Sequence, residues 1–416
     1  MGKIYLISII ISLVFISNIV AVNSYKNIEV NSFNNNLKIL STNTNSSILI
    51  INNNTELSQV ATSGDGSQYH PFIIQDYNIT CPNLQTIGIL VSNTNSYFTI
   101  RNSTLNRCKS GIMIDNVNFA IVENNTIMNS ITGIVTTNSF HINIINNEFF
   151  GITGLGIESN KLFNSLIVGN NLIDFNNFHF GIYLFKSDSN DVKSNNINAG
   201  FFSGIYLASS NNNDIANNLI SDSGRALDFY ISKSNIVASN QLTSNGIGVY
   251  LEESCEMNYI TSNIIVNSTY DGFLLSQASH NVLTNNTASQ NEYNGFEVDD
   301  SNNNSLIENI ALSNKLSGFY IGFSRNNYIK SNLASLNGVS GYNLTDSNNN
   351  ILMFNKAENN KKDIIIQNSV GTTFTDNNFP IPQQGLDLTP LIVATVIAVP
   401  IVITFVKVYD KRKGKN

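Results

Sequence analysis

A pattern of alternating apolar and variable residues recurs along the chain with a period of about 23 residues. Gly295, Gly318 and Gly341 each begin one unit, and the first and third residues after each of these glycines are apolar. Alternation with a period of two indicates β-strands rather than helices. Because a fixed repeat of this length is typical of a solenoid, the sequence predicts short strands that stack on their copies one turn further along.

The glycine position recurs often enough to predict the number of turns. Stacked copies of short strands form a parallel β-helix, in which each coil pairs with the coils before and after it. We therefore expect an all-β fold, a single-stranded parallel β-helix of about 13 coils over residues 81–379. The position is occupied by Gly88, Gly111, Gly133, Gly156, Gly181, Gly204, Ala226, Gly248, Gly272, Gly295, Gly318, Gly341 and Asp363.

A second recurring position carries asparagine, and a third carries serine more weakly. Stacked side-chain amides hydrogen-bond along a solenoid, so these positions predict inward ladders at the corners between strands. Asn102 and Asn124 also match the N-glycosylation sequon, but we expect them unmodified because the ladder would bury them. The asparagine ladder is predicted at Asn102, Asn124, Asn147, Asn170, Asn195, Asn218, Asn240, Asn263, Asn286, Asn309, Asn332, Asn355 and Asn377.

The N-terminal region precedes the repeats. In residues 1–24, Lys3 stands before a long apolar run, which predicts a secretory signal peptide, with an uncleaved anchor as the alternative. Residues 25–80 are predicted to form a lead-in and an N-terminal cap. Within the cap, Asn54 or Thr55 is expected to begin a short helix that covers the open end of the β-helix.

The C-terminal region follows the last repeat. Residues 380–390 contain several prolines and predict a short linker. Residues 391–406 are apolar throughout and predict a transmembrane helix, and residues 407–416 form a basic tail that belongs in the cytoplasm. The expected arrangement is a single-pass membrane protein with the β-helix on the cell surface.

Composition narrows the function classes. Charged residues make up 12% of the chain and the net charge is −7, which gives no basic surface for nucleic acid. The three cysteines form no framework in a chain of this length. Cys81 and Cys108 could meet on neighbouring coils, and buried or turn cysteines without a disulfide are the simpler interpretation.

The segment GDGSQYHPFIIQDYNI, residues 64–79, resembles the opening motif of the NosD-type right-handed parallel β-helix proteins. This resemblance implies right-handed coils up to about residue 379, and it brings the copper-binding label often given to that family. Copper needs clustered His, Met or Cys ligands, whereas the four histidines are scattered, so we expect no metal site and no cofactor. The residues that carry the resemblance are Gly64, Asp65, Gly66, Ser67, Pro71, Phe72, Ile74 and Tyr77.

Candidate ligand-binding residues occupy the outward positions two and four residues after each glycine. Aromatic faces stack on sugar rings and carboxylates accept hydrogen bonds from hydroxyls, so this band predicts binding of a polysaccharide or surface glycan. The alternative is that tyrosine simply suits an exposed strand surface. The ligand-binding candidates are Tyr183, Tyr206, Tyr230, Tyr250 and Tyr320.

The same band offers carboxylate pairs for catalysis. Asp228 with Glu252, or Glu297 with Asp299, fits the spacing that glycoside hydrolysis requires. A polysaccharide lyase would also want basic residues near a Ca²⁺ site, and no arginine-rich catalytic motif is present. The sequence therefore favours a membrane-anchored display or adhesion scaffold that binds carbohydrate, and a polysaccharide lyase or glycoside hydrolase on the same scaffold is the alternative.

Overall fold

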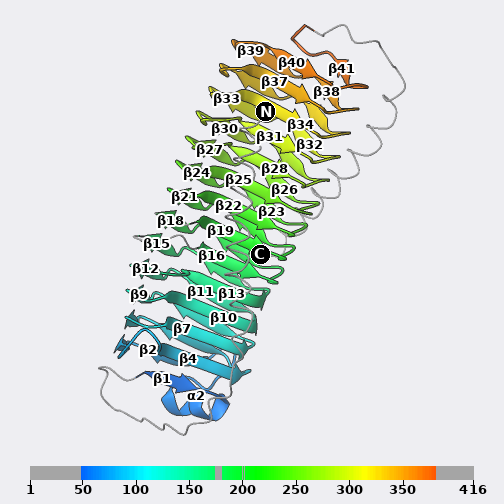
Figure 1. Ribbon diagram of the computed structural model, residues 1–416. Helices are drawn as coiled ribbons and strands as arrows, with labels where there is room; N and C mark the ends of the chain where they lie inside the picture. The colour runs from blue at the N-terminus through cyan, green and yellow to red at the C-terminus, as the bar shows by residue number, and fades with distance from the viewer. Residues whose placement is uncertain (1–47, 174–179, 199, 201, 381–416) are drawn as a thin grey trace. The chain divides into compact units, whose positions relative to one another are not determined.

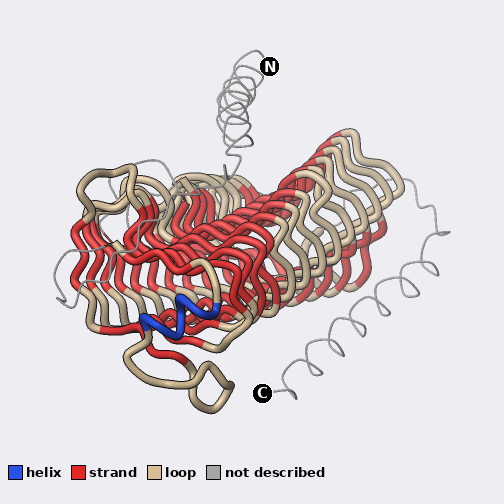
Figure 2. The backbone as a smooth tube through the Cα atoms, turned by 90° about the horizontal axis from the view of Figure 1, so that it is seen from below, coloured by secondary structure: helices blue, strands red, loops and turns tan. Residues whose placement is uncertain are grey.

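The computed structural model describes residues 48–173, 180–198, 200 and 202–380. In this part of the chain, three parallel sheets run along a column of coils, and each coil gives one strand to each sheet (Figure 1). Figure 2, seen from below, shows the strands of successive coils lying over one another. The predicted right-handed, single-stranded parallel β-helix is therefore confirmed.

Sheet 1 contains the longest strands of the coils. Its strands, in order, are β1 (Leu49–Ile51), β4 (Ile87–Thr94), β7 (Ser110–Val117), β10 (Thr132–Phe140), β13 (Ile157–Phe163), β16 (Phe180–Phe185), β19 (Ser203–Ala208), β22 (Arg225–Tyr230), β25 (Ile247–Glu252), β28 (Phe273–Ser276), β31 (Phe296–Asp299), β34 (Ser317–Gly322), β37 (Ser340–Thr345) and β40 (Ile364–Gln367).

Sheet 2 follows sheet 1 in each coil. Its strands are β2 (Phe72–Gln75), β5 (Phe98–Arg101), β8 (Ala120–Glu123), β11 (Ile142–Ile145), β14 (Leu166–Val168), β17 (Asp191–Lys193), β20 (Asp214–Ala216), β23 (Ile236–Ala238), β26 (Tyr259–Thr261), β29 (Val282–Thr284), β32 (Ser305–Ile307), β35 (Tyr328–Lys330), β38 (Ile351–Met353) and β41 (Thr373–Thr375).

Sheet 3 closes each coil with short strands. These are β3 (Asn78–Thr80), β6 (Thr104–Asn106), β9 (Thr126–Met128), β12 (Glu148–Phe150), β15 (Asn171–Ile173), β18 (Asn196–Asn198), β21 (Leu219–Ser221), β24 (Gln241–Thr243), β27 (Ile264–Val266), β30 (Thr287–Ser289), β33 (Ile310–Leu312), β36 (Leu333–Ser335) and β39 (Lys356–Glu358).

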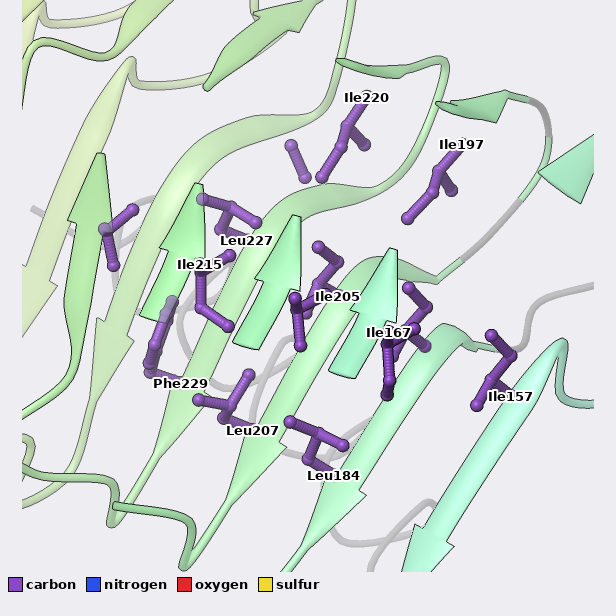
Figure 3. Close-up of a cluster of buried hydrophobic side chains, with 14 of the residues drawn as sticks. Ile157, Ile167, Leu184, Ile197, Ile205, Leu207, Ile215, Ile220, Leu227 and Phe229 are labelled. Atoms are coloured by element: carbon purple, nitrogen blue, oxygen red, sulfur yellow. The ribbon is translucent and has the colours of Figure 1, made fainter. Parts of the chain in front are cut away.

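The core fills the inside of the column with one layer of apolar side chains per coil. Ile205 and Leu207 of sheet 1 meet Ile215 of sheet 2 and Ile220 of sheet 3, and all four are fully buried (Figure 3). Further along, Phe273, Phe296, Phe319 and Tyr342 stack inside the column with ring centroids 4.6, 4.8 and 5.1 Å apart. Like residues therefore pack on like residues, which keeps the coils in register.

The recurring glycine enters sheet 1 where neighbouring coils come closest. A Cβ atom on Gly133 would lie 2.4 Å from the carbonyl oxygen of Gly156 and 2.4 Å from the ring of Phe149. A side chain at Gly133 would therefore press on the backbone of the next coil, which explains why most coils have glycine at this point, with alanine at Ala226 as the smallest replacement.

The asparagine ladder is confirmed at the corner between sheets 2 and 3, with a correction at the first two of its predicted positions. There, Ser103 and Asn125 point inward, while the predicted Asn102 and Asn124 are exposed and have φ angles of 51° and 53°. Asparagine suits this left-handed turn position as well as the ladder, so the sequence placed the ladder one residue too early. Burial therefore gives no reason to expect the two sequons unmodified.

Two further ladders occupy the other corners, and the sequence analysis missed their asparagines. In most members the side-chain amide donates to the asparagine side-chain oxygen of the next coil. Asn304 and Asn327 instead make this bond through their backbone N–H groups, and the amide of Asn245 donates to the carbonyl oxygen of Ile220. Buried hydrogen bonds therefore run along both corners of the column. Between sheets 1 and 2 the ladder contains Asn190, Asn213, Asn235, Asn258, Asn281, Asn304, Asn327 and Asn350. Between sheets 3 and 1 it contains Asn245, Asn291, Asn314, Asn337 and Asn360.

The helix α2 (Asn54–Val60) lies across the first coils at the N-terminal end of the described column (Figure 1). Its N-cap is Asn53, rather than Asn54 or Thr55, because the Asn53 side chain accepts a hydrogen bond of 2.9 Å from the backbone N–H of Glu56. Leu57 is fully buried in the core, so the helix covers the apolar interior at that end.

Cys81 and Cys108 form a disulfide between neighbouring coils, which corrects the interpretation of these residues as unpaired. Residue spacing alone did not show that both side chains reach the same corner. The weaker serine ladder also lies at the corner between sheets 1 and 2, where the hydroxyl of Ser232 accepts a hydrogen bond from the backbone N–H of Ser210. Cys255 takes the place of a serine in this ladder, and its buried Sγ accepts a hydrogen bond from the backbone N–H of Ser232.

The predicted signal peptide, the linker, the transmembrane helix and the basic tail lie outside the described residues, as does most of the lead-in. Within the described ranges, none of the helical segments has both the length and the apolar character needed to cross a bilayer.

Candidate functional site

The outer face of sheet 1 carries the candidate residues in rows, one coil after another. Backbone pairing sets Tyr206 beside Tyr183 on one side and Asp228 on the other, and Tyr250 follows Asp228. The first row contains Tyr183, Tyr206, Asp228, Tyr250, Glu297 and Tyr320, and the second contains Tyr230, Glu252 and Asp299.

A third row, formed by the residue before each glycine, escaped the sequence analysis. Strict alternation would turn this residue inward, but the glycine breaks the alternation. A Cβ on Gly204 would point at Ile220 in the core, and Ile205 is also in the core, so Ser203 faces outward. We call the three rows together the sheet 1 band, and the third row adds Phe180, Ser203, Arg225, Ile247, Asp271 and Asn294.

Aromatic rings gather at the N-terminal half of the sheet 1 band. The ring of Tyr206 stacks on Phe180 at 4.7 Å and on Tyr183 at 5.4 Å, with interplanar angles of 14° and 10°. These rings therefore cover much of each other's faces and present their edges and hydroxyl groups outward. The prediction of free aromatic faces is replaced by a rigid, stacked group of half-buried rings.

Arg225 occupies the centre of the sheet 1 band. Its Nη1 donates to Asp228 at 3.0 Å and lies 3.6 Å from a carboxylate oxygen of Glu252. Its guanidinium group lies 4.4 Å from the centre of the Tyr250 ring and 5.2 Å from that of Phe202. One guanidinium group thus joins two carboxylates and two rings, an arrangement that fixes all of them.

Burial separates the roles of the two carboxylates that Arg225 holds. Asp228 has no exposed surface, and its Oδ2 also accepts a hydrogen bond of 2.8 Å from Ser203, so it cannot reach a bound chain. The prediction of Asp228 as an exposed catalytic partner is therefore wrong. Tyr250 is 9% exposed and shields Arg225, so it too contributes support rather than surface.

Glu252 keeps part of its side chain exposed, at 17%. Burial raises the pKa of Glu252 to about 7, the Asp228 carboxylate adds to this rise, and Arg225 opposes it. Burial, with the charge of Glu158, also raises the pKa of Tyr183 to about 12. A carboxyl group that changes its charge near neutral pH can exchange a proton with a ligand or hydrogen-bond to it in either state.

A second carboxyl cluster follows two coils later. The side-chain amide of Asn294 donates to Glu297 at 2.8 Å, and its backbone N–H donates to Asp271 at 2.9 Å. The side chains of Asp271 and Glu297 also hydrogen-bond to each other, which requires a shared proton. Burial raises the pKa of Glu297 to about 8, and the nearby Asp271 carboxylate adds to the rise.

The remaining candidates lie at the edges of these clusters. Burial raises the pKa of Asp299 to about 6, with Glu297 adding to the rise. The ring of Tyr320 leans over Gly322, where a Cβ would lie 2.6 Å from it and 3.0 Å from Asp299. Tyr230 is half-buried and pairs with Glu252 in the second row.

The charge of the sheet 1 band is negative. Glu158 pairs with Tyr183 in the first row and adds another carboxyl group to those of Asp228, Glu252 and the second cluster. Among the described residues of the three rows, Arg225 is the basic group that faces them, and both of its nearest carboxylates already compensate its charge. An acidic ligand would meet like charges here, whereas a neutral ligand would not.

The residues that could bind a metal are dispersed in the part of the chain that the structure describes. No group of three or more His, Cys, Asp or Glu side chains is gathered there as a metal ion would require. The sulfur atoms of Cys81 and Cys108 are joined to each other, and the thiol of Cys255 is buried.

Solved structures with the same architecture include enzymes that act on polysaccharides. The periplasmic alginate epimerase AlgG superposes with a TM-score of 0.55 at 16% identity, over 74% of this chain and 85% of that chain. The A-module of the mannuronan C-5 epimerase AlgE4 from Azotobacter vinelandii gives a TM-score of 0.43 at 11% identity, over 81% of this chain and 98% of that chain. At these identities the likeness to AlgG shows the fold alone. Comparison with curated proteins gives no match.

A family model described as "Periplasmic copper-binding protein (NosD)" matches residues 69–223, 179–317 and 268–389. These matches together span well over half of the chain. The copper that this description implies finds no suitable group of ligands among the described residues, and the function proposed below does not depend on it. The repeats and their β-helical coils nevertheless agree with the match over the described residues within it, and the chain therefore belongs to the NosD family.

Proposed function

We propose that this protein binds a neutral glycan along the sheet 1 band and displays it, or adheres to it, at the cell surface. The observation that carries the proposal is the group of stacked rings beside Arg225 and Glu252. Stacked tyrosines are rigid and amphipathic, so they lose little conformational entropy when a ligand binds their edges and hydroxyl groups. The partly exposed Glu252 adds a hydrogen-bonding carboxyl group that suits sugar hydroxyls, and the buried Arg225 holds it in place.

The related fold of AlgG supports a carbohydrate ligand in general, and the charge of the band favours a neutral one over a uronate chain. AlgG is named as an alginate epimerase, and alginate is acidic. In the protein described here, carboxyl groups outnumber basic groups on the sheet 1 band. A polyuronate would therefore be repelled unless a cation bridged it to the band. We therefore expect a neutral hexose polymer rather than alginate.

This function is tested by measuring the affinity of the full-length protein, kept in detergent, for oligosaccharides. Cellohexaose and mannohexaose represent neutral chains, and an alginate hexasaccharide represents acidic ones, each titrated by calorimetry at pH 8. We expect a neutral chain to bind and the acidic one to bind at least tenfold more weakly. Replacing Tyr183 and Tyr206 together by alanine should weaken neutral binding about tenfold, which corresponds to about 1.4 kcal/mol.

Tyr328→Ala provides the matched control because Tyr328 lies on sheet 2, away from the band. It should leave the affinity unchanged, and Tyr206→Phe should retain the ring stack and most of the binding. If the double alanine variant binds neutral chains as tightly as the natural protein, or if only the alginate chain binds, the proposal is wrong.

Cleavage of the glycan is the second candidate function, and the pKa of Glu252 near neutral pH favours it. A general acid must be protonated and must reach the substrate; a pKa of about 7 leaves Glu252 protonated in about half of the molecules at pH 7, and its side chain is partly exposed. Its predicted partner Asp228 is buried, so a second group would have to come from water or from another coil. Chain-length analysis of the same hexasaccharides checks this: turnover that disappears in Glu252→Gln while binding persists would establish an enzyme.

The display role requires that the β-helix stand outside the cell, held by the apolar segment at residues 391–406. Protease treatment of intact cells tests this arrangement. A tag placed after residue 416 should be protected, whereas a tag inserted at the exposed Tyr69 should be removed. Removal of both tags, or release of the untreated protein into the medium, would argue against a single-pass anchor.

A further inference from the structure

A second pocket lies away from the sheet 1 band, at the corner where sheet 1 turns into sheet 2 in the first coils. Tyr97, Phe119 and His141 stand at matching positions directly before β5, β8 and β11. The rings of Tyr97 and Phe119 are 4.2 Å apart, and those of Phe119 and His141 are 5.4 Å apart, with interplanar angles of 10° and 4°. We call these three residues the corner stack.

The corner stack ends at His141, where the next coil supplies no ring. Asn143 pairs with Leu166 in the backbone register, so the position that matches His141 is Asn164. Asn164 is exposed, and it lines the same pocket as the three rings. The outer face of the His141 ring is therefore left without an aromatic neighbour in the stack.

The pocket over the corner stack has a volume of about 440 Å³, within the range of about 300–1,000 Å³ for small-molecule sites. Its apolar wall includes Pro71, Ala120 and Leu166, and its amide groups belong to Gln68, Asn143 and Asn164. No carboxylate, lysine or arginine lines it among the described residues. The lining thus combines flat rings, aliphatic surface and neutral hydrogen-bonding groups.

The GDG motif builds the outer wall of this pocket, a role that the sequence analysis did not assign. The backbone N–H groups of Asp65 and Gly66 both donate to the carbonyl oxygen of His70, and the carbonyl oxygen of Gly66 accepts a hydrogen bond of 3.0 Å from Tyr97. Gly66 has a φ of 80°, and a Cβ there would lie 2.4 Å from the ring of Phe72. The motif therefore fixes the loop that carries Gln68 against the first ring of the stack.

We propose that this pocket binds an uncharged pyranose ring, which takes the next place in the corner stack above Asn164. The apolar face of a sugar ring packs on an aromatic face, here that of His141. Its hydroxyl groups find hydrogen-bond partners in the amides of Asn143, Asn164 and Gln68, and a lining without carboxylate, lysine or arginine favours a neutral ligand over an ionic one. This site is separate from the sheet 1 band and does not depend on glycan binding there.

The test uses N-acetylglucosamine and methyl glucoside as probes and the ring signals of histidine as the readout. The chain contains four histidines, so the His141 signal in the NMR spectrum of histidine-labelled full-length protein can be assigned by comparison with His141→Gln. We expect one of the sugars to shift the His141 signal saturably, with a dissociation constant in the millimolar range, and to leave His280 unchanged.

Asn164→Phe supplies the decisive variant because its ring would fill the open place in the stack. Phe323 and Phe354 already adopt φ angles of 49° and 57°, close to the 51° of Asn164, so this chain accommodates phenylalanine in that conformation. In the variant, the His141 signal measured without sugar should be shifted and the melting temperature should stay that of the natural protein. Sugar binding should be at least tenfold weaker.

The Tyr183→Ala, Tyr206→Ala variant should bind the monosaccharides like the natural protein, which distinguishes this pocket from the sheet 1 band. The proposal is overturned if neither sugar shifts the His141 signal, if His280 shifts equally, or if Asn164→Phe binds as tightly as the natural chain.

Discussion

Asn195→Ala is expected to lower the free energy of unfolding by at least about 3 kcal/mol. The Asn195 side chain donates to Ile167 at 2.9 Å and to Asn218 at 3.0 Å, and its oxygen accepts two hydrogen bonds of 3.0 Å from Asn170. Alanine would remove all four in a position that is 1% exposed. Each buried group left without a partner costs roughly 1–3 kcal/mol, so the loss should be large.

Asn196→Ala is the matched control, because Asn196 is the next residue, lies exposed at the start of β18 and donates to Asn171 at the surface. Urea unfolding followed by circular dichroism should show a change below about 0.5 kcal/mol for this variant. Asn195→Ser should recover part of the stability, since Ser103 serves the corresponding position between β5 and β6. Equal unfolding midpoints for the two alanine variants would contradict the claim that the buried ladder stabilises the fold.

The period of the repeat predicted the coils and their register because every coil presents the same residue types to the same neighbours. What it could not settle was a choice between adjacent residues. Asn124 and Asn125 both suit a corner, one for its left-handed turn and the other for its ladder, and only Asn125 lies three residues after the buried Val122. Counting from the inward aliphatic residue would have found the ladder.

The site was predicted less completely than the fold, and the glycine explains why. Two consecutive residues, such as Gly204 and Ile205, turn inward where the chain bends into sheet 1, so the alternation shifts by one. The residue before the glycine then faces outward, and it supplies Arg225 and Asp271. Polar residues repeated just before the glycine were the available signal, because they could not have been tolerated in the core.

The exposure of a side chain on the sheet 1 band could not be derived from the fact that it points out of the sheet. Coils lie only about 4.8 Å apart, so a long side chain covers a shorter one on the next coil. Arg225 and Tyr250 cover Asp228 in this way, and Asp228 becomes fully buried although it points out of the sheet. The chemistry of the band thus depends on partners from several coils, which a single repeat does not reveal.

The crowding of carboxyl groups on this face has a consequence for stability. Glu252, Asp299 and Glu297 all bind a proton more tightly in the folded chain than in the unfolded one, with pKa values of about 7, 6 and 8. Where the folded state binds more protons, stability falls as the pH rises. The protein should therefore be most stable in mildly acidic solution and lose stability between about pH 5 and pH 8.

Glu297→Gln is expected to remove much of this loss and to raise the melting temperature at pH 8.5 by roughly 5 °C. The pKa of Glu297 rises from an ordinary value of 4.5 to about 8, so its contribution to stability is complete below pH 4.5 and is lost as the pH rises through 8. Glutamine carries no charge at any of these pH values. It can accept the hydrogen bond of Asn294 and donate to Asp271, as the protonated glutamic acid does.

Melting temperatures measured from pH 5 to pH 8.5 check this prediction. The natural protein and Glu297→Gln should nearly coincide at pH 5 and separate progressively above pH 6, while Glu252 and Asp299 leave the variant some remaining pH dependence. Glu308→Gln removes a carboxylate from an exposed position in the same coil, at the corner between β32 and β33, and should follow the natural protein at every pH. Parallel curves for the natural protein and Glu297→Gln would mean that Glu297 is ionised in the folded chain, and the shared proton with Asp271 would then have to be abandoned.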